Sequence, residues 1–114
     1  MTPAELILQI EDRPRVEVQA WGQTLYMQPM SGTDRDSYDM ELHRAKDEKR
    51  ELENWRARYV VRCLFDAQGQ RVFTNEQAEA LGKKNSETIR RLFDLASDAS
   101  KTGGNALEQE AKNS

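Results

Sequence analysis

The stretch from Leu64 to Leu81, which reads LFDAQGQRVFTNEQAEAL, decides the fold. Its first two residues are apolar and predict the end of a helix, and the segment DAQG behind them predicts a tight turn. A short apolar step then leads to Thr74, which has Gln77 three residues later and so carries the capping-box signature of a helix start. The stretch therefore predicts a joint between two helices.

Upstream of this joint, the sequence predicts one long helix that starts at Thr33 or Asp34 and runs to about Phe65. Neither proline nor glycine interrupts this span, and its two ends are apolar. The middle, residues 46–51, reads KDEKRE. We expect this charged part to stand away from the core.

Downstream of the joint, a short helix is expected from Thr74 to Leu81, and Gly82 ends it. Ser86 is expected to cap a final helix, because an apolar stripe with helical spacing follows it. That stripe comprises Ile89, Leu92, Phe93, Ala96 and Ala99.

The N-terminal part of the chain predicts a short helix and a β-hairpin. Thr2 is a cap residue, and the helix is expected to end by Asp12 because Pro14 disfavours helical geometry at the residue before it. Apolar and polar residues alternate within residues 15–30, and Gly22 supplies a turn between two strands. A lone hairpin is marginally stable, so one of its faces must pack on helices or on a partner.

These elements predict a small α+β domain that is mainly helical, with the hairpin packed on about three helices. The chain has 114 residues, of which 37% are hydrophobic and 32% are charged, which suits one domain with a modest core. We expect this domain to cover residues 1–100. The polar residues 101–114 are expected to form a flexible tail.

Charge and cysteine content narrow the class of protein. The net charge is -3 and the sequence pI is about 5.2, which argues against a dedicated nucleic-acid binder. Cys63 is the only cysteine, so no intrachain disulfide forms and a reducing cytoplasm is expected. Residues 1–10 lack the basic and long apolar regions typical of a signal peptide, and no apolar run approaches membrane-spanning length, so we expect neither a signal peptide nor a membrane span. We therefore expect a cytoplasmic protein without a membrane partner.

The residue types that usually carry chemistry do not form a site. The turn at Asp66 lacks the carboxylates that a calcium loop needs at its later ligand positions. His43 is the only histidine and lies in the charged part of the long helix, where we expect it to be solvated. Cys63 is expected to be a small core residue whose pKa Asp66 raises if the two lie close. We therefore expect no catalytic residue, metal or cofactor.

A DNA-binding regulator is the alternative function. The last two helices resemble a helix-turn-helix, in which Lys83, Lys84, Arg90 and Arg91 would contact DNA. The two lysines replace the usual apolar turn residue, however, and Thr88 is one residue too far along, which rotates the second helix by about 100°. The purely structural alternative to a DNA-binding motif is an antiparallel pair of core helices whose lysines are solvated. An adaptor domain is a third option.

Apolar residues near the N-terminus are the candidates for binding a protein partner. They are Leu6 and Ile7 of the first helix and Trp21 and Tyr26 of the hairpin. The two hairpin aromatics, together with Trp55, predict either an aromatic binding surface or a filled interface between hairpin and helices.

The order of these pieces resembles the tail assembly chaperones of long-tailed, siphovirus-type phages and prophages. The resemblance covers roughly residues 14–114, and the helix before Pro14 is not part of it. It rests on four stretches: VEVQAWG at 16–22, YVVRCLFD at 59–66, GQRVFT at 69–74 and LGKKNS at 81–86.

This resemblance implies a non-enzymatic role. Members of the family bind the tape-measure protein, coat its long hydrophobic helices and recruit tail-tube subunits, which are copies of the major tail protein. The resemblance also implies self-association, action in the cytoplasm of the bacterial host and absence from the finished virion. No motif in the chain marks the family's binding residues.

Overall fold

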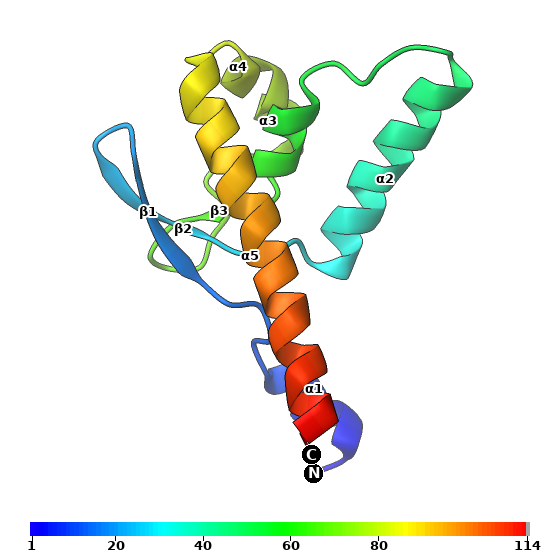
Figure 1. Ribbon diagram of the computed structural model, residues 1–114, viewed down its shortest axis with the longest axis vertical. Coiled ribbons are helices and arrows are strands. Elements are labelled where there is room, and N and C mark those ends of the chain that lie inside the picture. The colour runs from blue at the N-terminus through cyan, green and yellow to red at the C-terminus, as the bar shows by residue number, and fades with distance from the viewer. Residues whose placement is uncertain (114) are drawn as a thin grey trace.

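The computed structural model describes the backbone of residues 1–113 and the side chains of residues 1–101. It is a mainly helical α+β fold with a small antiparallel sheet, as expected, and its principal extents are 45 × 39 × 26 Å. Figure 1 shows the β1–β2 hairpin projecting to one side of the helices. The helical elements are α1 (Pro3–Gln9), α2 (Gly32–Asp47), α3 (Trp55–Val60), a 3-10 turn (Asn75–Gln77), α4 (Ala78–Gly82) and α5 (Ser86–Asn113).

The sheet contains the expected hairpin and one further strand. The hairpin pairs β1 (Val16–Ala20) with β2 (Gln23–Met27), and β3 (Leu64–Phe65) pairs with the other edge of β2. We predicted Leu64 and Phe65 as a helix end, and this prediction is wrong. Both residues are buried and contribute to the core as an extended strand, because a partner strand lies beside them.

The predicted long helix is also wrong, because it breaks between α2 and α3. Lys49 and Asn54 adopt left-handed φ angles, both at 54°. The N–H of Arg50 bonds to the carbonyl of Ala45 at 2.9 Å, and that of Lys49 bonds to Lys46 at 3.0 Å, which is a Schellman helix end. The charged stretch has no apolar stripe to hold it on the core, so the helix ends there. Residues 46–51 are exposed, as expected.

Helix caps shift slightly from their expected positions. Ser31 Oγ accepts from the N–H of Asp34 at 3.2 Å, so Ser31 caps α2 in place of Thr33 or Asp34. Asn85, one residue before the expected Ser86, accepts two backbone bonds from the first turn of α5 at 3.0 and 3.3 Å. Both are residue types that favour capping positions, so the error is one of register.

Other helix signals are confirmed. Thr2 Oγ1 accepts from the N–H of Glu5 at 3.2 Å and caps α1. The capping box of Thr74 and Gln77 is present, with Thr74 N–H donating to Gln77 Oε1 at 2.8 Å. The predicted stripe of α5 faces the core: Ile89, Leu92, Ala96 and Ala99 are buried, and Phe93 packs against them.

The core lies where α3 packs on α4 and α5, with the sheet beneath them. Its largest fully buried apolar side chains are Met27, Leu64, Leu92, Val60, Val61 and Cys63. In Figure 1, α2 stands to one side of this body and α1 lies at the opposite end from α4 and the hairpin turn.

The backbone of α5 stays helical through Gly103 and Gly104, where the sequence predicted a break. The division into a domain of residues 1–100 and a flexible tail of residues 101–114 stays a prediction. Among the residues that the structure describes, no helix combines the length and the apolar character needed to cross a lipid bilayer.

Candidate partner-binding surfaces

Helix α1 presents apolar side chains to solvent. Its exposed fractions are 50% at Leu6, 66% at Ile7 and 84% at Leu8, and no residue of the helix is buried. Glu5 and Gln9 lie four residues apart and so share the polar side. An amphipathic helix normally buries its apolar side against another element, so α1 offers an apolar surface that no side chain within residues 1–101 buries.

Trp21 lies in the hairpin turn in a strained backbone conformation. Trp21 and Gly22 have φ angles of 52° and 73°, the pattern of a two-residue turn that needs a positive φ at both positions. Asn and Gly suit the first position far better than a bulky aromatic residue. Backbone strain of this kind is typical of functional sites. The indole of Trp21, which is 41% exposed, is therefore a candidate for contact with a partner.

A groove of about 360 Å³ opens beside this indole, between the hairpin turn and α4, and we call it the hairpin groove. Trp21 packs edge-on against Phe73 with ring centroids 6.4 Å apart. Ala80 and Leu81 of α4 form the apolar floor, and Lys84 lies at one side. Gln23 and Gln77 also line it, so within the side chains described the groove is mainly apolar, with two amide groups and a single positive charge.

The three aromatic residues of the predicted surface have separate partners. The guanidinium of Arg15 stacks over the ring of Tyr26 at 4.3 Å. Trp55 packs on Phe93, with centroids 5.1 Å apart. Tyr26 and Trp55 thus each contact another side chain of the chain and remain partly accessible, whereas Trp21 borders the hairpin groove.

The hairpin also exposes a sheet edge, because the strand order is β1-β2-β3 and β1 is outermost. Unpaired strand edges readily add another strand. One end of this edge is covered, since Arg91 Nη2 donates to the carbonyl of Gln19 at 2.9 Å.

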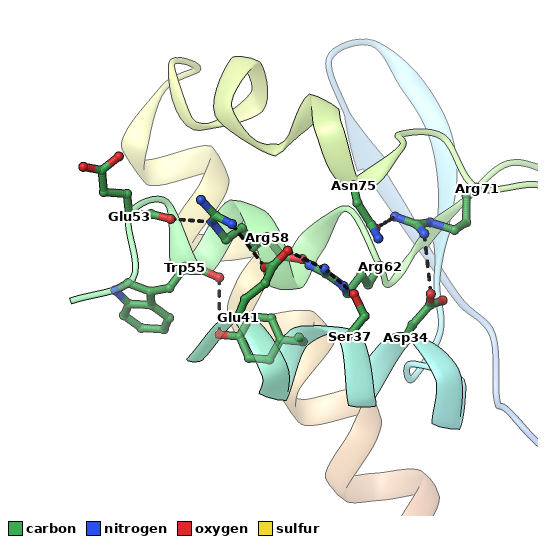
Figure 2. A network of polar contacts seen from close by, with 10 residues as sticks. Asp34, Ser37, Glu41, Glu53, Trp55, Arg58, Arg62, Arg71 and Asn75 are labelled. Atoms are coloured by element: carbon green, nitrogen blue, oxygen red, sulfur yellow. Dashed lines mark hydrogen bonds and ion pairs between the residues drawn. The ribbon is translucent and has the colours of Figure 1, made fainter. Parts of the chain in front are cut away.

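A polar network holds α2 against α3, and sequence reasoning missed it (Figure 2). The fully buried guanidinium of Arg62 donates to Ser37 Oγ at 2.9 Å, to Glu41 Oε1 at 3.0 Å and to the Arg58 carbonyl at 2.7 Å. Arg58 pairs with the other carboxylate oxygen of Glu41 at 3.2 Å. The signal was present in the sequence, because an arginine inside the apolar run VVRCLF must find buried partners.

A second arginine, Arg71, makes a further set of polar contacts near the start of α2. Arg71 donates from Nε to the Val61 carbonyl at 3.0 Å and from Nη2 to Asn75 Oδ1 at 2.7 Å, and it lies 3.6 Å from Asp34 (Figure 2). These contacts join the start of α2 to the segment after β3. These contacts of Arg71 serve the fold, since its guanidinium is directed at groups of the chain on three sides.

The four residues of the predicted DNA-binding surface do not present four free charges. Lys83 and Lys84 are exposed in the turn between α4 and α5. Arg90 pairs with Glu87 at 2.6 Å, and this hydrogen bond raises the pKa of Arg90. Arg91 is the residue that binds Gln19 on the hairpin. The DNA-binding alternative therefore gains no support from the arginines.

The residues considered for chemistry lie in structural roles. Asp66 Oδ1 accepts from the N–H groups of Gln68 and Gln70, each at 2.9 Å, and so stabilises its own turn. Burial raises the pKa of the Cys63 thiol to about 12, and the carboxylate of Asp34, not the expected Asp66, acts in the same direction. His43 is exposed. Among the described side chains, no group of three metal-ligand residues converges.

Comparison with known proteins gives a family and a related fold. A protein family described as phage tail assembly chaperone matches residues 12–113. The solved structure of the tail assembly chaperone of bacteriophage HK97 is similar, with a TM-score of 0.61 and 15% sequence identity, over 86% of this chain and 98% of that chain. At this identity the structural likeness concerns the fold alone. No curated protein matches the chain.

Proposed function

The chain belongs to the phage tail assembly chaperone family, and we propose that it is a non-enzymatic chaperone that binds the tape-measure protein and helps to recruit the major tail protein. Tape-measure proteins of this class contain long hydrophobic helices, as the resemblance implied. A chaperone for such a client needs exposed apolar side chains on a body whose own core is already closed.

The observation that carries this proposal is the exposed apolar side of α1, which takes no part in the core formed by the described side chains. Leu6 and Ile7 are at least half exposed, while the core cluster contains no residue of α1. We assign partner binding to these two residues and to Trp21 and Tyr26 of the hairpin. Partners in this sense are the client and further copies of the chain, since β1 also offers an open edge. We place this activity in the cytoplasm of the bacterial host and expect the protein to be absent from the finished virion.

Co-expression with the tape-measure protein of the same phage tests the proposal. We expect the wild-type chain to raise the soluble fraction of the client and Ile7→Asp to abolish this effect. Met40→Asp is the matched control, because Met40 is 62% exposed, against 66% for Ile7, but lies on α2. A client that stays insoluble with the wild-type chain, or that is rescued equally by both variants, would contradict the proposal. Recruitment is measured by whether the soluble complex captures the major tail protein.

A gel shift with double-stranded DNA separates the alternative. The chaperone proposal predicts no tight binding at physiological salt. Salt-sensitive binding that Arg90→Ala weakens would favour a regulator that uses Lys83, Lys84, Arg90 and Arg91.

A further inference from the structure

We infer that α1 is an arm that binds the hairpin groove of a second copy of this chain, a proposal that rests on the self-association included in the proposed function. The arm precedes residues 12–113, which match the family, so it adds to the part of the chain that the family describes. Its apolar side is exposed, and the hairpin groove is a mainly apolar hollow with no occupant among the side chains that the structure describes. An amphipathic helix in an apolar groove is a common mode of recognition.

The chain's own groove is out of reach of its own arm. The carbonyl of Arg13 accepts from Gln28 Nε2 at 3.2 Å, and Arg15 donates to the carbonyl of Asp66 at 2.8 Å, so the chain is fastened from Arg13 onward. The segment from Gln9 to Arg13 spans at most about 14 Å when fully extended. The distance along β1 from Val16 to the hairpin turn is about 17 Å, and the distance from Arg13 is longer still because Arg13 precedes Val16. The linker is therefore too short to carry α1 to the groove of its own chain.

The arrangement of the elements agrees with this estimate. Figure 1 shows α1 at one end of the molecule, while the turn of the hairpin and α4 lie at the other end. An arm that points away from its own groove is suited to bind the groove of a neighbour. Such a head-to-tail contact leaves each copy with one free arm or one free groove, so it extends into a ring or a filament unless two copies exchange arms.

Shape and charge fit on both sides. Leu6 and Ile7 can enter between Trp21 and the floor of the groove, which Ala80 helps to form. The polar side of the arm carries Glu5, and the groove carries Lys84. Both lie at the edge of the contact, so their attraction contributes more to orientation than to affinity.

Sedimentation velocity over a concentration series, without any client, tests the arm. We expect the wild-type chain to self-associate, and we expect Ile7→Asp and Ala80→Glu each to weaken association by at least about tenfold, as removal of an interface anchor does. Ile7 and Ala80 are both exposed, so neither change disturbs the core. Met40→Asp should leave association unchanged. Glu5→Lys should weaken it by a few-fold, and adding Lys84→Glu should restore it.

Cysteine pairing tests which copy supplies the arm. Cys63 is buried, so any disulfide that forms joins the introduced, exposed cysteines. Mixing an Ile7→Cys chain with an Ala80→Cys chain under mild oxidation should give a disulfide-linked dimer of the two chains. A Glu79→Cys chain used in place of the Ala80→Cys chain should not give this dimer. The chain that carries both Ile7→Cys and Ala80→Cys should link to other chains and not within itself.

Several results would overturn the inference. They are a wild-type chain that is monomeric at every concentration, a bridge formed within one chain, and equal bridging by Glu79→Cys. A further contrary result is that Ala80→Glu spares association and abolishes only client rescue, because the groove would then bind the client. The solubility of the tape-measure protein is measured separately, so the chaperone function and the arm can fail independently.

Discussion

Arg62 and Glu41 form an ion pair in which the guanidinium is fully buried and the carboxylate is 26% exposed, with Nη2 and Oε1 3.0 Å apart. The pair connects the turn after α3 to α2 across the break in the predicted long helix. In an unbroken helix the two residues would lie about 31 Å apart along the axis, at a rise of 1.5 Å per residue. The break at residues 48–54 is therefore what allows the pair to form.

Glu41→Ala should destabilise the fold, because it leaves the Arg62 charge buried with fewer partners. We expect a loss of about 2 kcal/mol in the free energy of unfolding, below the roughly 3–5 kcal/mol of a fully buried pair, because Glu41 is partly exposed and Ser37 still accepts from Arg62. Urea denaturation measures this loss.

The exposed pair of Arg35 and Asp39 is the control for this prediction. Its side chains are 54% and 41% exposed, so Asp39→Ala should change stability by no more than about 0.5 kcal/mol. Equal losses in Glu41→Ala and Asp39→Ala would mean that burial of Arg62 does not decide the effect.

Gly82→Ala should destabilise the contact between α4 and the start of α3. A Cβ at position 82 would lie 2.8 Å from Cγ of Asn54, so the Asn54 side chain would have to move. Asn54 is exposed and its side chain can turn into solvent, so we expect a loss of about 1 kcal/mol, the low end of the usual cost of an added group. Asn54→Gly removes the obstacle and suits the left-handed φ of 54° at that position.

The double variant Asn54→Gly/Gly82→Ala should recover most of that loss, which thermal unfolding of all four chains measures as a coupling energy. Additive losses in the double variant would show that the alanine clashes with something other than Asn54.

Sequence patterns predicted the elements whose causes are local. The hairpin follows from alternating residues around Gly22, and the buried side of α5 follows from helical spacing between Ile89 and Ala99. These features need only neighbours along the chain to be recognised.

The missed features depend on contacts between distant segments. β3 is two residues long and exists because β2 offers an edge to Leu64 and Phe65. The end of α2 relies on a lysine in a left-handed conformation at position 49, where glycine is the usual signal.

The candidate surface was predicted in part. Trp21 and the first helix were named from their apolar character, but the hairpin groove also needs Phe73 and Ala80 from a segment 50 to 60 residues later. Sequence alone could not bring these residues together, because Trp21 meets Phe73 only through the packing of two segments that are distant along the chain.

Trp21→Asn should leave stability nearly unchanged while it weakens partner binding. Asparagine relieves the strain of the left-handed φ, a gain of about 1–2 kcal/mol. It also loses the edge-on contact with Phe73 and part of the indole burial, a loss of similar size. Trp55→Asn is the matched control: Trp55 is 37% exposed but has no positive φ, so its loss should not be offset. Chemical denaturation measures the stability of both variants, and sedimentation velocity measures the loss of partner binding in Trp21→Asn. Equal losses of stability in the two variants would contradict strain at Trp21.

Alkaline pH should destabilise the fold through Cys63. Burial raises the pKa of this thiol from its ordinary value of 9.0 to about 12. Above pH 9 the unfolded chain loses the proton while the folded chain keeps it, so the free energy of unfolding falls as pH rises from 9 to 12. A difference of one proton corresponds to about 1.4 kcal/mol per pH unit. Reduced protein unfolded in urea at pH 8, 9, 10 and 11 measures this slope.

Cys63→Ala isolates the thiol from other groups that titrate in the same range. The pKa of Tyr38 is also raised by burial, so Tyr38 weakens the fold in the same direction, but it does so equally in both chains. The wild-type chain should therefore lose more stability than Cys63→Ala between pH 9 and 11, although the variant starts lower because it has lost a buried sulfur atom. Parallel curves for the two chains would show that the thiol ionises in the folded state as readily as in the unfolded one, which a side chain with no exposed surface should not do.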